Sequence, residues 1–232
     1  MRLSIVLAGA VAGLATAGAA TADTLFSNPY VSSPIDCSFS TTCAADAGRG
    51  DYFAAQEFTL ASAAVITSAD FIESDLGTVP TDINWGFAVN DGPGGLPGTI
   101  LAIGADTLSG ASLGTDPNTG FNISRMSWTL GTVALGPGTY YLAIQAISPT
   151  FSTFLNQGVL TSGAAASADG GVTWVSGYAC VSGGGCLSSI AVDLYGTSVG
   201  GVPEPASWAL MLVGVGAVGA ALRRRRPFVT VA

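Results

Sequence analysis

The stretch that decides the fold is the turn sequence Gly136-Pro137-Gly138 followed by Thr139-Tyr140-Tyr141-Leu142-Ala143-Ile144-Gln145-Ala146-Ile147. Glycine and proline meet the backbone requirements of a tight turn, and β-branched and aromatic side chains favour strands. The stretch therefore predicts a turn that leads into a β-strand over residues 139–147.

Short runs of the same kind recur along the middle of the chain, and glycine and proline separate them. Turn sequences stand at Asp91-Gly92-Pro93-Gly94-Gly95 and at Asp116-Pro117-Asn118. Outside the two terminal segments, no window carries the period of an amphipathic helix. Many short strands at this spacing predict an all-β fold, an antiparallel, jelly-roll-like β-sandwich. The other predicted strands cover residues 52–60, 64–72, 83–89, 100–104, 121–130, 172–176 and 189–195.

The first 22 residues have the three parts of a secretory signal peptide. Met1-Arg2 is a minimal basic region, residues 3–14 are apolar, and Ala20-Thr21-Ala22 forms an A-x-A cleavage site for signal peptidase. An N-terminal membrane anchor is the weaker interpretation, because the small residues from 15 to 22 suit a peptidase better than a lipid core. We expect export and removal of residues 1–22.

The C-terminal segment, residues 201–232, combines a short motif, an apolar stretch and a basic cluster. Pro203-Glu204-Pro205 comes first, residues 206–222 are apolar or small, and Arg223, Arg224, Arg225 and Arg226 follow. As a helix, residues 206–222 reach roughly 26 Å, slightly short of a hydrocarbon core of about 30 Å but inside the range that spans one. The arginines are costly to move through lipid and hold their end in the cytoplasm, so the preceding chain faces outward.

Between these segments, residues 23–200 are predicted to form one domain. From residue 24 to residue 202 the sequence holds thirteen Asp and Glu against Arg49 and Arg125, which gives a net charge of −11. Nucleic-acid binding is excluded, because phosphate contacts need a cationic patch that this composition does not supply. The composition predicts an acidic extracellular module.

Catalysis is not expected of this domain. The chain contains no His, and all of its basic side chains are arginines, so the usual general bases and activators of nucleophiles are missing. A pair of carboxylates could still hydrolyse a glycoside, and Glu57 and Glu73 are the only glutamates before the C-terminal segment. A glycoside hydrolase is therefore the remote alternative.

The four cysteines form two pairs in sequence, Cys37 with Cys43 and Cys180 with Cys186. In an exported protein, an even number of cysteines at loop-like spacing favours disulfides. Pairing within each loop is the first choice, and pairing between the two loops stays open if the first and last strands are neighbours. An oxidising compartment and the absence of His argue against a zinc site.

One local motif is sharper than the rest: Ser167-x-Asp169-x-Gly171-x-Thr173-Trp174 matches the Asp-box pattern of sialidases and other β-propellers. In that pattern the Asp caps a hairpin turn and the Trp packs beneath it. Sialidase chemistry would need several copies and an arginine cluster, whereas this chain has one copy. We expect a structural hairpin in which Asp169 accepts hydrogen bonds from backbone donors of its own turn.

Aromatic and acidic residues suggest a second class of function, carbohydrate binding. Aromatic rings can stack on pyranose rings, and acidic loop residues can accept sugar hydroxyls or hold a structural calcium ion. Core packing and a solvated surface are the ordinary roles of such residues, so no metal ligand is assigned and no other cofactor is expected. The candidates are Trp85, Trp128, Trp174, Tyr140, Tyr141 and Tyr178 for stacking, and Asp70, Glu73, Asp75 and Asp91 for oxygen ligands.

Over roughly residues 202–226, the motif, the apolar stretch and the arginine cluster resemble the PEP-CTERM tail of exported bacterial proteins. Upstream, residues 56–60, 96–99, 135–143 and 190–196 are similar to the β-sandwich ectodomains often found before such tails. The resemblance implies a Gram-negative bacterium, a transient stay in the inner membrane and processing near residues 203–205 by an exosortase, a membrane-embedded cysteine transpeptidase. It also implies a place at the cell surface or in the extracellular matrix, in exopolysaccharide or biofilm production, with a carbohydrate-binding module as the alternative.

Overall fold

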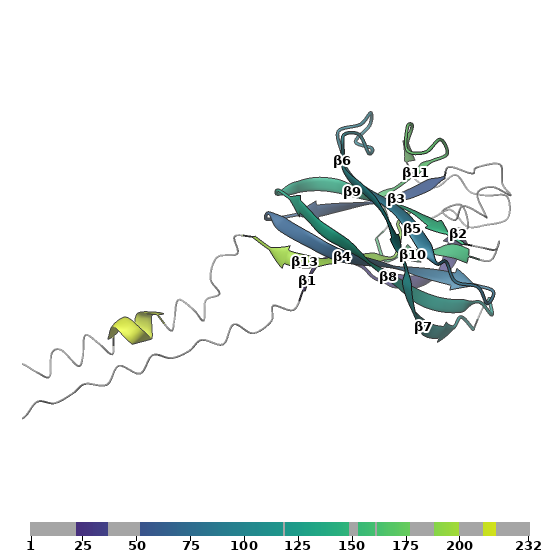
Figure 1. Cartoon of the computed structure of the whole chain (residues 1–232), viewed down its shortest axis with the longest axis horizontal. Coiled ribbons are helices and arrows are strands. Elements are labelled where there is room, and N and C mark those ends of the chain that lie inside the picture. Colours follow the sequence, from purple (N-terminus) through teal and green to yellow (C-terminus); the bar gives the residue numbers. More distant parts are fainter. Residues whose placement is uncertain are drawn as a thin grey trace, which may run out of the picture.

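The computed structural model describes residues 22–36, 52–117, 119–148, 153–160, 162–176, 188–199 and 211–216. Within them the chain forms thirteen strands in two antiparallel sheets, and a helical turn covers residues 211–216 (Figure 1). The prediction of an all-β sandwich is confirmed.

The first sheet has seven strands and is built around the long strand β4 (Ala64–Asp75). On one side, β4 pairs along its length with β8 (Asn122–Leu135), which in turn pairs with β7 (Ser109–Thr115). On the other side, β4 pairs with β13 (Val192–Ser198) and β10 (Thr153–Gly158). The sheet is completed by β1 (Asp23–Asn28) beside β13 and β2 (Tyr30–Asp36) beside β10.

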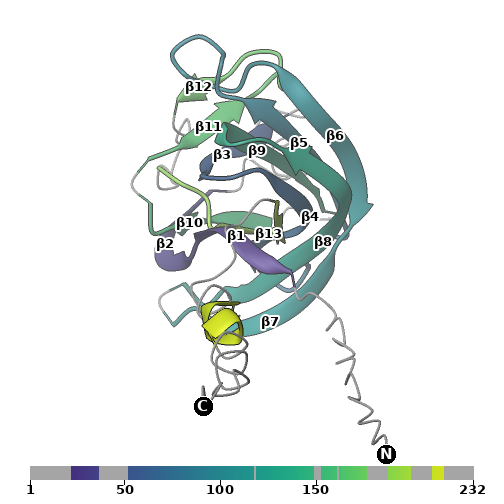
Figure 2. The same ribbon diagram turned by 90° about the vertical axis from the view of Figure 1, so that its left-hand side faces the viewer.

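The second sheet has six strands, and its order decides where the candidate site lies. The strands follow one another as β12 (Val175–Ser176), β11 (Ala164–Ser167), β3 (Phe53–Leu60), β9 (Gly138–Ile147), β5 (Asp82–Val89) and β6 (Ile100–Thr107). The stretch quoted first above is thus β9, a central strand held between β3 and β5. Figure 2 shows the two sheets stacked as a sandwich.

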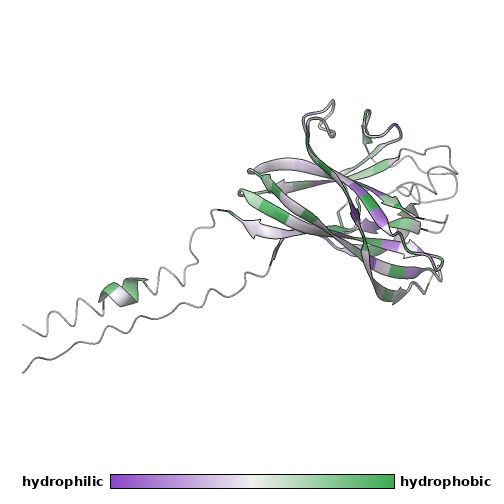
Figure 3. Ribbon diagram, viewed as in Figure 1, coloured by the Kyte–Doolittle hydropathy of each residue, from purple (hydrophilic) through white to green (hydrophobic). Residues whose placement is uncertain are grey.

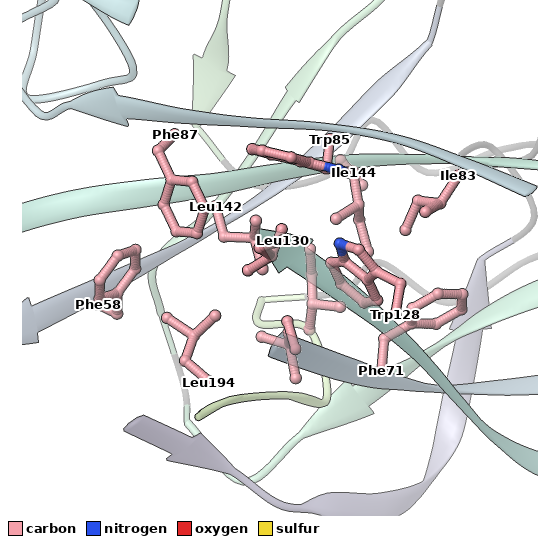
Figure 4. Close-up of a cluster of buried hydrophobic side chains, with 14 of the residues drawn as sticks. Phe58, Phe71, Ile83, Trp85, Phe87, Trp128, Leu130, Leu142, Ile144 and Leu194 are labelled. Carbon is pink, nitrogen blue, oxygen red and sulfur yellow. The ribbon is translucent and has the colours of Figure 1, made fainter. Parts of the chain in front are cut away.

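The core lies between the two sheets and is rich in aromatic rings (Figure 4). Phe87 packs edge to face against Phe58 and Trp85, with ring centroids 5.9 and 6.0 Å apart, and Phe71 packs in the same way against Trp128 at 6.0 Å. Burying one such side chain stabilises the fold by about 1.5–3 kcal/mol. Apolar and polar residues alternate along several strands (Figure 3), because successive side chains point to opposite faces.

Most of the predicted strands are present, and their ends lie within five residues of the predicted ones. The prediction of a strand over 172–176 is wrong for most of its length, because the Asp-box turn occupies residues up to Thr173 and only β12 remains. Five strands were not predicted. They are β1, β2, β7, β10 and β11.

Several predicted features fall outside the described residues. Ala22 is described and exposed just before β1, and residues 211–216 of the predicted membrane helix are helical. Among the described helical residues, none forms a segment long and apolar enough to cross a membrane. The predicted sites that lie outside are Ala20, Cys37, Cys43, Cys180, Cys186, Pro203, Glu204, Pro205, Arg223, Arg224, Arg225 and Arg226.

Candidate functional site: a groove between two loops

The face of the six-stranded sheet that points away from the core is partly covered by two loops. Small buried side chains, Ala55, Ala143 and Ala165, lie on this face, and Leu96 and Trp174 pack against it from the two loops. One loop joins β5 to β6 and the other joins β11 to β12, and both rise above the sheet in Figure 1. Between them lies a groove of about 560 Å³.

The loop between β11 and β12 is the Asp-box turn. Asp169 Oδ1 accepts hydrogen bonds from the backbone N–H of Thr173 at 2.8 Å and from the Ser167 hydroxyl at 2.8 Å, and Asp169 Oδ2 accepts one from the Thr173 hydroxyl at 2.6 Å. The Ser167 hydroxyl also accepts the N–H of Gly171 at 2.8 Å. The hydrogen bonds from Thr173 and Ser167 lower the pKa of Asp169 to about 2, so the turn is held by an ionised carboxylate.

The loop between β5 and β6 uses the same device. Asp91 accepts the backbone N–H of Thr99 at 2.6 Å and the Thr99 hydroxyl at 2.7 Å, and these bonds lower the pKa of Asp91. The Tyr141 hydroxyl, rising from β9 beneath the loop, donates to the Gly95 carbonyl at 3.0 Å and to Glu57 at 3.2 Å. Asp91 is therefore a loop clamp like Asp169, although Asp91 lies eight residues before its Thr and Asp169 only four, so the Asp-box pattern did not reveal it.

The groove itself is aromatic and apolar, with one polar side chain. Trp174 stands at one wall and donates its indole Nε1–H to the Gly171 carbonyl at 3.0 Å, which fixes the orientation of its ring. Ile103 of the edge strand β6, 74% exposed, forms part of the opposite wall. Asn84 of β5 lies in the lining and donates to Gln145 at 3.0 Å. The floor is made of small residues, Gly86, Ala88 and Ala143.

The lining suits binding of an uncharged ligand better than acid–base chemistry. Within the part of the chain that the structure describes, the groove-lining side chains carry no charge. A rigid aromatic ring, apolar walls and one amide are the usual elements of a preformed ligand site. Sequence reasoning singled out Trp174 but missed Asn84 and Ile103, because only the pairing of β5 with β6 brings these residues to the same wall.

The comparison with known families concerns the other end of the chain. Residues 201–226 match the family model of the PEP-CTERM protein-sorting motif. The chain carries a PEP-CTERM motif. This motif supports an exported protein that an exosortase sorts across the membrane to the cell surface. No curated protein matches the chain.

Of the aromatic candidates for sugar stacking, Trp174 and Trp85 border the groove, and the other candidates in the described part of the chain do not. Trp128 belongs to the core, and Trp85 packs there as well, with its Nε1–H donated to Asp106 at 2.7 Å. Tyr140 packs against the core, and Tyr141 is buried beneath the loop. Tyr178 lies outside the described residues.

The acidic candidates do not assemble into one site either. Glu57 is on β3 and Glu73 is buried on β4, so the two glutamates lie on different sheets. Asp70 pairs with Arg125 at 3.5 Å and accepts the Tyr195 hydroxyl at 2.9 Å, and burial raises the pKa of Asp70 to about 6. Among the described residues, no three acidic, His or Cys side chains come together as metal ligands.

Proposed function

We propose that this PEP-CTERM protein is an envelope substrate of the exosortase. Signal peptidase removes residues 1–22, the apolar stretch 206–222 holds the chain transiently in the inner membrane of a Gram-negative cell, and processing near residues 203–205 releases the β-sandwich. The mature domain then serves as a cell-surface or matrix component associated with exopolysaccharide.

The observation that carries this proposal is the match to the sorting motif, together with the place where the fold ends. The last strand, β13, ends at Ser198, and the motif begins at residue 201. Every strand of the two sheets therefore lies before the expected processing site. Removal of the C-terminal segment takes no strand from the sandwich, as a sorting mechanism that discards its signal requires.

The intact mass of the surface form tests the sorting step. We expect the wild-type protein to lack residues 1–22 and the segment beyond the motif. The double substitution Pro203→Ala and Pro205→Ala is expected to leave the C-terminal segment attached and the protein in the membrane fraction. Pro227→Ala, just outside the matched residues 201–226, is the matched control and should be processed like the wild type. Full-length protein in the cytosol, with no membrane association, would contradict the proposal.

Carbohydrate binding is the second candidate function, and the groove favours it. The Trp174 ring, held by its hydrogen bond to Gly171, offers a rigid apolar surface of the kind on which pyranose rings stack, and Asn84 offers an amide for hydroxyls. The net charge of −11 over residues 24–202 disfavours acidic glycans, so we expect an uncharged polysaccharide.

A glycan array with the processed protein tests this second function. Trp174→Ala is expected to weaken binding at least about tenfold, because stacking on one aromatic ring is lost, whereas Trp174→Phe should retain part of it. Phe121→Ala is the control, because Phe121 stacks on Phe154 with centroids 5.0 Å apart and is not part of the groove. A blank array for the wild type would favour a matrix subunit without a glycan ligand.

A further inference from the structure

The free edges of the two sheets differ in how well they are protected against pairing with another chain. Edge strands expose unpaired backbone groups, and proteins usually protect them with charge, proline or shortness. Strand β12 is only two residues long, β2 contains Pro34 and β1 begins with Asp23. Strand β7 consists of small and hydroxyl residues apart from Leu113.

Strand β6 has an edge that is both long and apolar. It has eight residues, pairs with β5 alone and contains no Lys, Arg or Pro. Its exposed side chains include Ile100, Leu101 and Ile103, with 62, 46 and 74% of their surfaces accessible. Its one acidic residue, Asp106, accepts the Trp85 indole N–H at 2.7 Å. An exposed apolar edge of this length is a template for strand addition.

The register of β6 defines which side chains would meet a partner. Ile103 lies opposite Gly86, on the face that carries the groove, and the strand is regular from Ala102 to Thr107. Side chains two residues apart share a face, so Ala105 lies on the same side as Ile103. Ile100, which lies opposite Ala88 beyond the register shift that skips Leu101, lines the same groove. This row is uncharged, although residues 24–202 have a net charge of −11.

The row is complementary to itself. In an antiparallel pairing centred on Ile103, this residue faces its own counterpart and Ala102 faces Gly104 of the other copy, so the pairs at the centre of the interface are apolar. A two-fold axis through this centre closes the assembly at two copies. Two molecules of the same net charge repel elsewhere, so an uncharged edge is where a second copy can approach.

We propose that two copies of this chain pair antiparallel along β6, so that one continuous sheet runs through both. The axis of such a pair is perpendicular to the sheet, which places both grooves on the same face. Ile100 and Ile103 line each groove, so the two grooves meet at the shared edge. The pairing goes beyond the sorting function and does not depend on processing, so either idea can fail without the other.

Sedimentation velocity of the full chain in detergent tests the pairing. The wild type is expected to be a dimer, and Ile103→Lys is expected to raise the dissociation constant at least about tenfold, because it places two like charges at the centre of the interface. Leu113→Lys on β7 is the matched control, since Leu113 is 51% exposed on another edge, and it should stay dimeric. A monomeric wild type, or an Ile103→Lys variant that remains dimeric, would overturn the proposal.

Cysteine cross-linking reads the register directly and does not depend on how well the lysine variant folds. In the proposed pairing the two copies of residue 103 face each other at about 4.5–5.5 Å between Cβ atoms, so a small adjustment brings them to the roughly 3.5–4.5 Å of a disulfide. Ile103→Cys should therefore give a covalent dimer under oxidation, whereas wild type and Leu113→Cys should not. Equal cross-linking of both variants would indicate random collision, and capture of a different protein by Ile103→Cys would show that another partner occupies the edge.

Discussion

At the scale of single residues, Glu73 is the side chain whose environment differs most from water. It is fully buried on β4, and neither carboxyl oxygen has a hydrogen-bond partner within the described structure. Burial, and after it the nearby Asp75 carboxyl group, raises the pKa of Glu73 to about 9, so the residue is protonated at neutral pH.

Glu73 therefore predicts a pH dependence of stability. The unfolded chain loses this proton near pH 4.3 and the folded chain near pH 9, so the contribution is fully present below pH 4.3 and is lost as the pH rises towards 9. Glu73→Gln keeps the shape without the titration. Urea unfolding should show the wild type losing up to about 1.4 kcal/mol per pH unit between pH 6 and 8, with a flatter profile for the variant.

Between pH 6 and 8, the change in stability reports mainly on Glu73 and less on the other groups whose pKa is shifted. Asp70, whose raised pKa of about 6 acts in the same sense, releases its proton at the lower end of that window, and Tyr141, with a pKa of about 12, titrates well beyond it. Parallel pH profiles for wild type and Glu73→Gln would show that the carboxyl group is solvated in solution.

At the scale of elements, the two Asp-clamped loops define the groove, and the Asp-box turn can be tested separately. Asp169→Ala removes the acceptor of the Thr173 N–H, so amide exchange at Thr173 should become several-fold faster. Thr99, whose N–H is held by Asp91 in the other loop, is the internal control and should be unchanged. Unchanged exchange at Thr173 would show that strand pairing, and not the carboxylate, holds the turn.

The same turn has an expected acid limit. Because the pKa of Asp169 is lowered to about 2, its contribution is present above the unfolded value of about 3.9 and is lost as the pH falls towards 2. The thermal stability of the folded protein combines this acid limit with the loss that Glu73 causes as the pH rises from about 4.3 towards 9. The greatest stability is therefore expected at mildly acidic pH.

At the scale of the whole molecule, sorting and folding use separate parts of the chain. Within the described residues, the stretch of chain from β1 to β13 supplies the whole core of the sandwich. The sorting motif begins after β13, the last strand. This separation lets the segment that follows the core be discarded. It also leaves the groove and the edge of β6 on the part that stays outside the cell under the proposed function.

The sequence could predict those elements whose own residues have a strong preference for a strand or a turn. Residues 139–147 are strong strand formers that follow directly on a turn sequence. The observed strand, β9, begins one residue before the predicted start and ends at the predicted residue. Strand β11 is Ala164-Ala165-Ala166-Ser167, which has no strand preference of its own and is extended because it pairs with β3. Likewise, β7 is rich in glycine and serine and forms because β8 extends beside it.

By itself, the sequence determined the fold class, the C-terminal PEP-CTERM motif and the Asp-box pattern, because each depends on residues that are close together in the chain. Only the tertiary structure decided that Trp85 belongs in the core while Trp174 lines a groove, and that Ile103 stands on a free edge. These outcomes depend on which strands become neighbours. Pairing brings together residues far apart in sequence, such as Asn84 and Gln145, and no local pattern contains that information.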